Sequence, residues 1–207
     1  TRSRQVTGVQ TCALPISKIR KEQYEGNLRI YCHSALVETV RTIANLTLPK
    51  KFTRLLDHRI QFVPLHNGDT KHILDYDVTF FDILSTKAKQ YGFTMRLRNG
   101  QKLTCAGDEP LNEQCFGYAE SSDWLMHEAF CLYSQRNQYD PYEKHHSTVR
   151  EACELASCLN VPNLILYHTE DDNIERRKAL YTAEGRLYYK GNLYVPDDLE
   201  CIEFDEV

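Results

Sequence analysis

The sequence AGDEP at residues 106–110 is the first of three short motifs that decide the fold, and HHST at 145–148 and LYHT at 166–169 follow it. Each motif adjoins a predicted strand end or helix start. Asp108 supplies a carboxylate, and His146 and His168 supply imidazoles. Carboxylate oxygens and imidazole nitrogens are common ligands of zinc. The three motifs therefore indicate a metal site built at the ends of strands.

Apolar periodicity predicts a chain of mixed strands and helices. We predict strands over 28–32, 59–65, 76–84, 93–98, 102–106, 123–126, 163–167, 187–189, 193–195 and 201–204, and helices over 35–46, 49–57, 148–159 and 174–184. Thr148 and Glu151 have the spacing of a capping box, and Gly185 is a candidate C-cap. Asn99-Gly100 predicts a type I′ hairpin turn. This order of elements favours an α/β sheet sandwich with helices outside.

The order and spacing of the motifs, with His127-Glu128-Ala129 between the first two, resemble those of the metallo-β-lactamase-fold hydrolases, particularly the ribonuclease Z-like members. The resemblance implies an αββα sandwich, truncated at the N-terminus. It implies two divalent metal ions, zinc with manganese or iron as alternatives, held by Asp108 and His168. It gives His146 a catalytic role as acid or charge stabiliser and Glu128 a supporting role. Taken singly, each of these residues also fits a purely structural role in a turn or loop.

Two departures from the family pattern qualify this interpretation. Residues 1–17 resemble the translation of a sequencing adapter, so we expect 18–207 to be the C-terminal part of a single metallo-β-lactamase-fold domain. The family cluster H-x-H-x-D-H does not occur in this sequence. The resemblance places it upstream of Lys18, and we expect no turnover without it. Leu84 stands where the resemblance predicts another ligand histidine; His66 and His72 are the alternatives, although both are expected on exposed segments.

Composition limits the classes of partner. The formal net charge is −4, and residues 1–17 contribute two arginines and no acidic residue, so the remainder carries −6. A general nucleic-acid binder is usually basic, although a local patch such as Pro49–Arg54 can still dock phosphate. No apolar run is long enough to predict a membrane span. The eight cysteines show no C-x-x-C spacing, which favours reduced thiols and a cytoplasmic setting.

The leading hypothesis is a fragment of a ribonuclease Z-like phosphodiesterase, a tRNA 3′-processing endonuclease acting on RNA such as precursor tRNA. A second hypothesis is a hydrolase of the same fold that acts on a small phosphoester or ester, such as a lactone, thioester or cyclic nucleotide, because one fold hosts many chemistries. A third is an inert binding module that lost its chemistry through Leu84. A homodimer is compatible with all three hypotheses.

Overall fold

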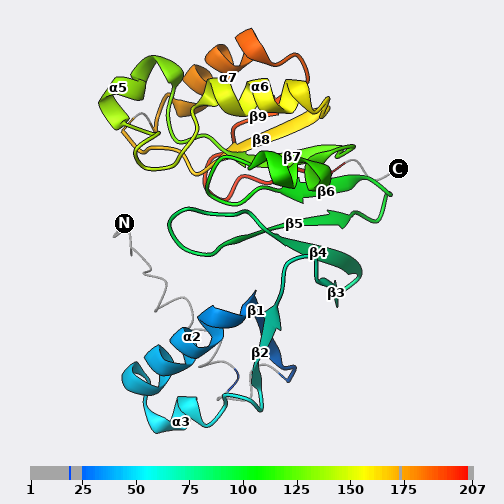
Figure 1. Cartoon of the computed structure of the whole chain (residues 1–207), viewed down its shortest axis with the longest axis vertical. Coiled ribbons are helices and arrows are strands. Elements are labelled where there is room, and N and C mark those ends of the chain that lie inside the picture. The colour runs from blue at the N-terminus through cyan, green and yellow to red at the C-terminus, as the bar shows by residue number, and fades with distance from the viewer. Residues whose placement is uncertain (1–18, 20–24, 173, 205–207) are drawn as a thin grey trace. The chain divides into compact units, whose positions relative to one another are not determined.

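The computed structural model describes residues 19, 25–172 and 174–204, and Figure 1 shows their helices and strands. The chain divides into two compact units, residues 1–66 and 67–207. The adapter-like segment 1–17 lies outside the described residues. Within the described part of the chain, no helix has the length and apolar character needed to cross a bilayer.

Within residues 25–66, the first unit contains two strands and two helices. In chain order they are β1 (Leu28–His33), α2 (Ser34–Thr47), α3 (Lys50–Thr53) and β2 (Ile60–Leu65), and β1 pairs with β2 in parallel. The His33 side chain caps α2 by accepting the backbone N–H of Leu36. Helix α3 is shorter than the predicted 49–57, because the chain turns through Asp57 at φ 65° before entering β2.

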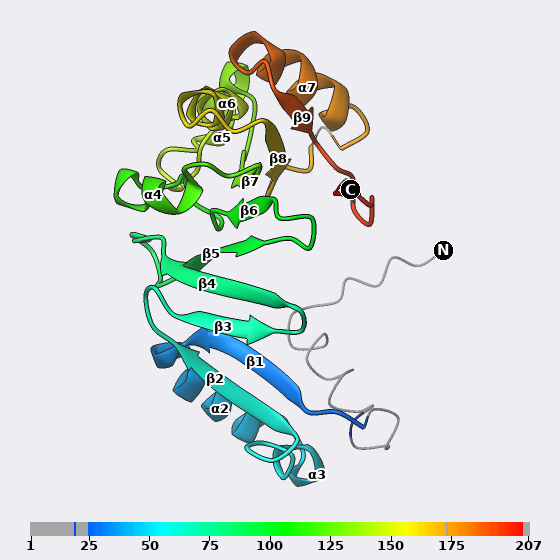
Figure 2. The ribbon, with the colours of Figure 1, turned by 90° about the vertical axis from the view of Figure 1, so that its right-hand side faces the viewer.

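The second unit is built on a seven-stranded sheet, whose strands follow one another in chain order from β3 to β9 (Figure 2). Its strands are β3 (Thr70–Ile73), β4 (Tyr76–Asp82), β5 (Tyr91–Arg96), β6 (Lys102–Cys105), β7 (Trp124–Glu128), β8 (Asn163–Tyr167) and β9 (Asn192–Tyr194). Pairing is antiparallel from β3 to β6 and parallel from β6 to β9. Strand β4 therefore runs in the same direction as β6, β7 and β8, and the C-terminal ends of all four lie at one edge of the sheet.

Two helices pack against this sheet and contribute to its core. Helix α6 (Val149–Cys158) packs on β7 and β8, and α7 (Arg177–Tyr188) packs on α6 and β9. The predicted capping box of Thr148 and Glu151 is present at the start of α6. Buried residues such as Phe81, Leu125 and Leu164 belong to one apolar cluster with both helices. The shorter helical segments are η1 (Glu113–Cys115), α4 (Phe116–Ala119), η2 (Tyr133–Gln135) and α5 (Arg136–Tyr139).

The predicted end of the last helix at Gly185 is wrong. Helix α7 continues through Gly185 to Tyr188, so the predicted strand 187–189 is absent. A Cβ at Gly185 would lie 2.5 Å from Leu193 Cδ2 and 3.0 Å from Cys153 Sγ. The glycine therefore permits close packing of the helix rather than terminating it. Such packing depends on residues distant in sequence, which local patterns do not reveal.

The structure differs from the sequence predictions at a missed strand, at residues 201–204 and at the Asn99-Gly100 turn. Strand β3 was not predicted, because its residues alternate between exposed and half-buried positions without a strong apolar signal. Residues 201–204 form no strand. At Asn99-Gly100 only Gly100 has a positive φ, and its N–H donates to the Leu97 carbonyl, so the turn is not type I′. The described cysteines are all free, and Cys158 and Cys201 are exposed.

A buried histidine links the end of β7 to the loop that follows β6. His127 Nε2 accepts the Leu111 backbone N–H at 3.1 Å, and Nδ1 lies 2.6 Å from the Glu128 carbonyl oxygen. This network assigns the proton to Nδ1, which donates, and leaves Nε2 as the acceptor. Burial lowers the pKa of His127 to about 4, against a smaller opposing contribution from the Glu128 carbonyl. The fold therefore requires a neutral imidazole here, because a second ring proton would oppose the Leu111 N–H.

We predict that Gly92→Ala lowers the free energy of unfolding by about 1–3 kcal/mol, the usual cost of overpacking. A Cβ at Gly92 would lie 2.5 Å from the Phe81 ring and 2.6 Å from the Cys105 carbonyl oxygen, which belongs to the sheet backbone. Gly117→Ala is the matched control, because no heavy atom lies within 4 Å of its added Cβ. Urea unfolding measures both variants. Equal midpoints for the two would contradict the prediction.

We predict that the stability contributed by neutral His127 is complete above pH 6.5 and is lost as the pH falls towards 4. In this window the unfolded chain binds a proton that the folded chain excludes, since the folded pKa is about 4. The stability difference between wild type and His127→Gln should shrink by roughly 2 kcal/mol from pH 7 to pH 5. Urea unfolding of both proteins at each pH measures this. An unchanged difference, or an NMR titration of the wild-type His127 ring above pH 6, would refute it.

Candidate active site

Side chains that follow three neighbouring strands converge at one edge of the second unit's sheet. Asp108 follows β6, Glu128 ends β7, and His168 follows β8. The parallel register of β6, β7 and β8 places these positions at the same edge. His146 joins them from the loop before α6, and its ring centroid lies 4.9 Å from that of His168. The structure thus brings together side chains from four separate segments.

The backbone takes left-handed conformations where it leaves these strands. Leu84 after β4 has φ 60°, Gly107 before Asp108 has φ 88°, and His168 has φ 54°. Left-handed φ values are strained for leucine and histidine and cost free energy. Tyr167 offsets part of this cost, because its hydroxyl donates to the Gly107 carbonyl and ties β8 to the loop of Asp108. Such conformations gather at functional sites, because function there depends on an exact side-chain direction.

His146 is held by groups on every side of its ring. Its Nδ1 lies 3.5 Å from Glu128 Oε2, and its Nε2 lies 3.4 Å from Lys87 Nζ. The Phe130 ring stacks on it at a centroid distance of 5.0 Å. The contact between Nδ1 and Oε2 lacks hydrogen-bond geometry, and both atoms are buried without another hydrogen-bond partner. The ring is therefore fixed by packing, chiefly against Phe130, with Nε2 directed towards Lys87.

Glu128 is completely buried at the end of β7. Its Oε1 accepts the Ser147 backbone N–H at 2.5 Å, and its backbone carbonyl accepts the Ser147 hydroxyl at 3.0 Å. Burial raises the pKa of Glu128 to about 8, while the hydrogen bonds of Ser147 oppose this and the Asp108 carboxylate adds to it. The residue therefore fixes the 146–148 loop against β7. This position also places its carboxyl group beside the imidazole of His146.

The protonation of His146 follows from its surroundings. Burial lowers the pKa of His146, and the charges of Lys87 and His168 lower it further, while Asp108 acts in the opposite direction. A neutral imidazole at neutral pH can hold or accept a proton at Nε2. The ring is thus suited to proton transfer at the atom that faces away from Glu128.

The donor atoms fit a divalent metal only in part. Asp108 Oδ1 is buried without a hydrogen-bond partner, as expected of an oxygen that binds a cation. His168 is exposed at the same edge and carries an imidazole. Among residues 19, 25–172 and 174–204, however, no three histidine, cysteine, aspartate or glutamate side chains gather closely enough to hold a metal ion. The described residues thus bring two candidate ligands, Asp108 and His168, to this edge and form no complete cage.

Leu84 lies on a pocket of about 280 Å³ beside the site, whose lining also includes Glu109, Tyr142, His145 and His146. The Leu84 side chain is 41% exposed, and Asp82 accepts its backbone N–H at 3.0 Å. A leucine here offers an apolar surface and no lone pair. The alternative His72 is exposed on β3, and its ring contacts Asp77 at 2.9 Å. His66 lies in the first unit.

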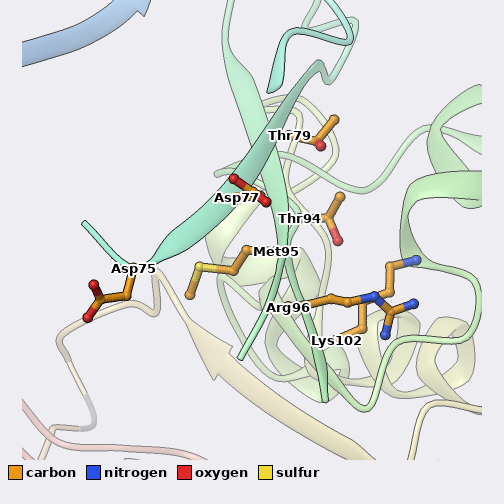
Figure 3. A pocket seen from close by; sticks show the side chains of 7 residues that line it. All are labelled: Asp75, Asp77, Thr79, Thr94, Met95, Arg96 and Lys102. Atoms are coloured by element: carbon orange, nitrogen blue, oxygen red, sulfur yellow. The ribbon is translucent and has the colours of Figure 1, made fainter. Parts of the chain in front are cut away.

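A second pocket, of about 500 Å³, lies over β4, β5 and β6 (Figure 3). Its lining includes Thr79, Thr94, Arg96 and Lys102. Thr94 and Thr104 on neighbouring strands share a hydrogen bond of 2.9 Å. This surface has hydroxyl and charged groups but no imidazole or thiol. Its carboxylates, Asp75 and Asp77, therefore lack the imidazole neighbours found at the edge where Asp108, His146 and His168 meet.

Two contributors to the site did not emerge as site residues from the sequence. Glu109 lies within the AGDEP motif; it is buried, and its carboxylate accepts the Ser85 hydroxyl of the loop that follows β4. Ser147 lies within HHST and connects Glu128 to the loop of His146. Their adjacency to Asp108 and His146 was the available signal. Their partners lie 19 or more residues away, so the contacts themselves required the structure.

Comparison of the sequence with curated proteins finds ribonuclease Z. The ribonuclease Z of Thermococcus sibiricus is 30% identical over 109 residues, which cover 53% of this chain and 33% of that protein. The ribonuclease Z of Thermococcus kodakarensis is 38% identical over 112 residues, which cover 52% of this chain and 33% of that protein. The matched stretch thus spans about a third of each relative. No protein-family model matches the chain.

Comparison with solved structures finds the metallo-β-lactamase fold. YhfI from Bacillus subtilis, a protein of this fold, matches with a TM-score of 0.69 at 15% identity, over 90% of this chain and 69% of that one. The short form of human tRNase Z matches with a TM-score of 0.55 at 16% identity, over 73% and 64% of the two chains. The predicted α/β class and fold are confirmed. This chain therefore has the metallo-β-lactamase fold and is ribonuclease Z-like in sequence over about half of its length.

Proposed function

We propose that residues 18–207 belong to a ribonuclease Z-like, metal-dependent phosphodiesterase of the cytoplasm that cleaves precursor tRNA. The likeness to proteins named ribonuclease Z supports the reaction class. The observation that carries the proposal is the meeting of the His146 and His168 rings, 4.9 Å apart, at the strand edge of Asp108. One carboxylate and two imidazoles at one edge combine metal ligands with a group that transfers protons.

In this proposal Asp108 and His168 hold metal ions, which supply an activated water and neutralise charge on the phosphodiester. Zinc is the candidate, with manganese and iron as alternatives, because all three accept oxygen and imidazole ligands. The remaining ligands come from the segment that the family resemblance places before Lys18. The two ligands within the described residues do not support turnover by themselves.

His146 acts on the leaving group in the same proposal. Its Nε2 lies 3.4 Å from Lys87 Nζ, and the ring in its protonated form gives the Nε2 proton to the leaving oxygen. Glu128 is a positioning residue, because its buried carboxyl group lies at Nδ1 and its Oε1 holds the loop through Ser147. Phe130 limits rotation of the imidazole by stacking on it. This arrangement keeps Nε2 directed away from the protein interior.

A small phosphoester or ester is the second candidate substrate. The pocket beside Leu84 has a volume of only about 280 Å³, and the net charge of the chain is −4. Both observations favour a small molecule over a long polyanion. Cleavage of a model phosphodiester without cleavage of precursor tRNA would select this alternative. Loss of both activities in a metal-loaded protein would leave a binding module.

We predict that His146→Gln, in the protein expressed from its complete reading frame, lowers kcat for a model phosphodiester about 10²–10⁴-fold. Glutamine keeps a polar side chain but cannot transfer a proton. His72→Gln is the matched control, because His72 is exposed on β3 and its ring contacts Asp77, away from the candidate site. Zinc content and steady-state rates are measured for all three proteins. An unchanged kcat in His146→Gln would contradict the catalytic role of His146, as would a loss of zinc together with activity.

We predict that Leu84→His raises zinc affinity at least about tenfold, because an imidazole then replaces an apolar side chain beside His146. Leu84→Asn is the control, since asparagine tolerates the left-handed backbone at φ 60° without adding an imidazole. Competition with a chromogenic zinc chelator gives both affinities. Equal affinity in the two variants would show that position 84 lies outside the metal site.

A further inference from the structure

The loop that follows β4 brings a lysine to the outer face of His146. Lys87 Nζ lies 3.4 Å from His146 Nε2, and the opposite ring nitrogen lies 3.5 Å from Glu128 Oε2. An ammonium group has only donors, so Nε2 is the acceptor in this contact. The ring is thus flanked by a buried carboxyl group inside and by an ammonium group towards solvent.

Glu109 holds this loop in place. Its Oε1 accepts the Ser85 hydroxyl at 2.7 Å, and its Oε2 accepts the Thr86 N–H at 3.4 Å. The Ser85 hydroxyl oxygen in turn accepts the Lys87 N–H at 3.1 Å. Glu109 is only 6% exposed. The partners of this buried carboxylate are a hydroxyl and an amide of the loop, so the carboxylate fixes the loop backbone. Lys87 is carried by that backbone.

The two lysines of this loop differ in their partners. Lys89 Nζ forms an ion pair with Asp82 Oδ2 at 3.0 Å. Within the described part of the chain, Lys87 forms no ion pair with a carboxylate and meets an imidazole instead. This contact disfavours protonation of His146, as the lowered pKa of that residue also indicates. An anionic oxygen between the two groups would accept one hydrogen bond from the Lys87 ammonium and, once the ring is protonated, a second from His146 Nε2.

We propose that Lys87 is the anion-binding residue of this site, which receives a non-bridging phosphoryl oxygen together with His146, and that Glu109 is the residue that positions it. The inference rests on the proposed function, because it states that the substrate bound at the same site is negatively charged. It assigns the site to phosphoesters rather than to neutral lactones or thioesters. An ammonium group binds phosphate as a point charge, so the interaction needs no bidentate geometry.

The test is the affinity of the full chain for inorganic phosphate, measured by calorimetry in metal-free buffer of low ionic strength. Lys87→Met should weaken binding at least tenfold, and Lys87→Arg should stay within about threefold of wild type, since it keeps the charge. Lys89→Met is the matched control and should stay within about twofold. Lys87→Met should also reduce the dependence of the affinity on salt. Unchanged phosphate affinity in Lys87→Met would overturn the proposal.

The role of Glu109 is tested by a double-mutant cycle. Glu109→Ala should weaken phosphate binding, Glu109→Gln should recover most of it by keeping an acceptor for Ser85, and adding Glu109→Ala to Lys87→Met should cause no further loss. A purely structural role would instead add its loss to that of Lys87→Met. Additive losses would therefore remove Glu109 from the proposal, and circular dichroism identifies any variant that fails to fold.

The outcomes separate this inference from the proposed function. Phosphate binding that depends on Lys87, in a protein that hydrolyses no phosphodiester even when loaded with metal, supports the anion site and contradicts the phosphodiesterase. Hydrolysis that persists unchanged in Lys87→Met, with unchanged phosphate affinity, supports the phosphodiesterase and contradicts the anion site.

Discussion

Parallel pairing of β6 with β7 and of β7 with β8 brings residues far apart in sequence to one edge of the sheet. Asp108, Glu128 and His168 each stand at the C-terminal end of one of these strands. Side chains on neighbouring parallel strands can meet without a long loop, because strands lie about 5 Å apart. The register therefore creates the site, and a slip in it would direct each side chain to the opposite face.

Buried polar groups keep this edge in a single arrangement. Neutral His127 joins the loop after β6 to β7, and Glu128 joins β7 to the loop of His146 through Ser147. Each contact is satisfied in only one protonation state or rotamer, so the network resists rearrangement. The same burial that fixes these loops also lowers the pKa of His127 and raises that of Glu128. Stability and site chemistry thus depend on the same residues.

The backbone conformations after β4 and β8 lower the stability of the fold but set the direction of the side chains there. Leu84 and His168 adopt left-handed backbone conformations that are unfavourable for their side chains. Apolar packing beneath them, around Leu164 and Leu166 of β8, supplies the compensating free energy. Lys87 extends the arrangement to the solvent side, where the loop held by Glu109 places a positive charge beside His146. The site therefore combines a rigid inner layer with a charged outer group.

The sequence by itself determined most strands, the capping box of α6 and the three motifs whose order resembles the metallo-β-lactamase fold, because these features depend on local periodicity and residue type. It did not determine that α7 passes through Gly185, since the need for glycine there comes from its close packing against Leu193 and Cys153. The placement of Lys87 against His146 was also decided only by tertiary structure. The two residues are 59 positions apart, and no local pattern encodes a contact made by a loop that a distant buried carboxylate holds in place.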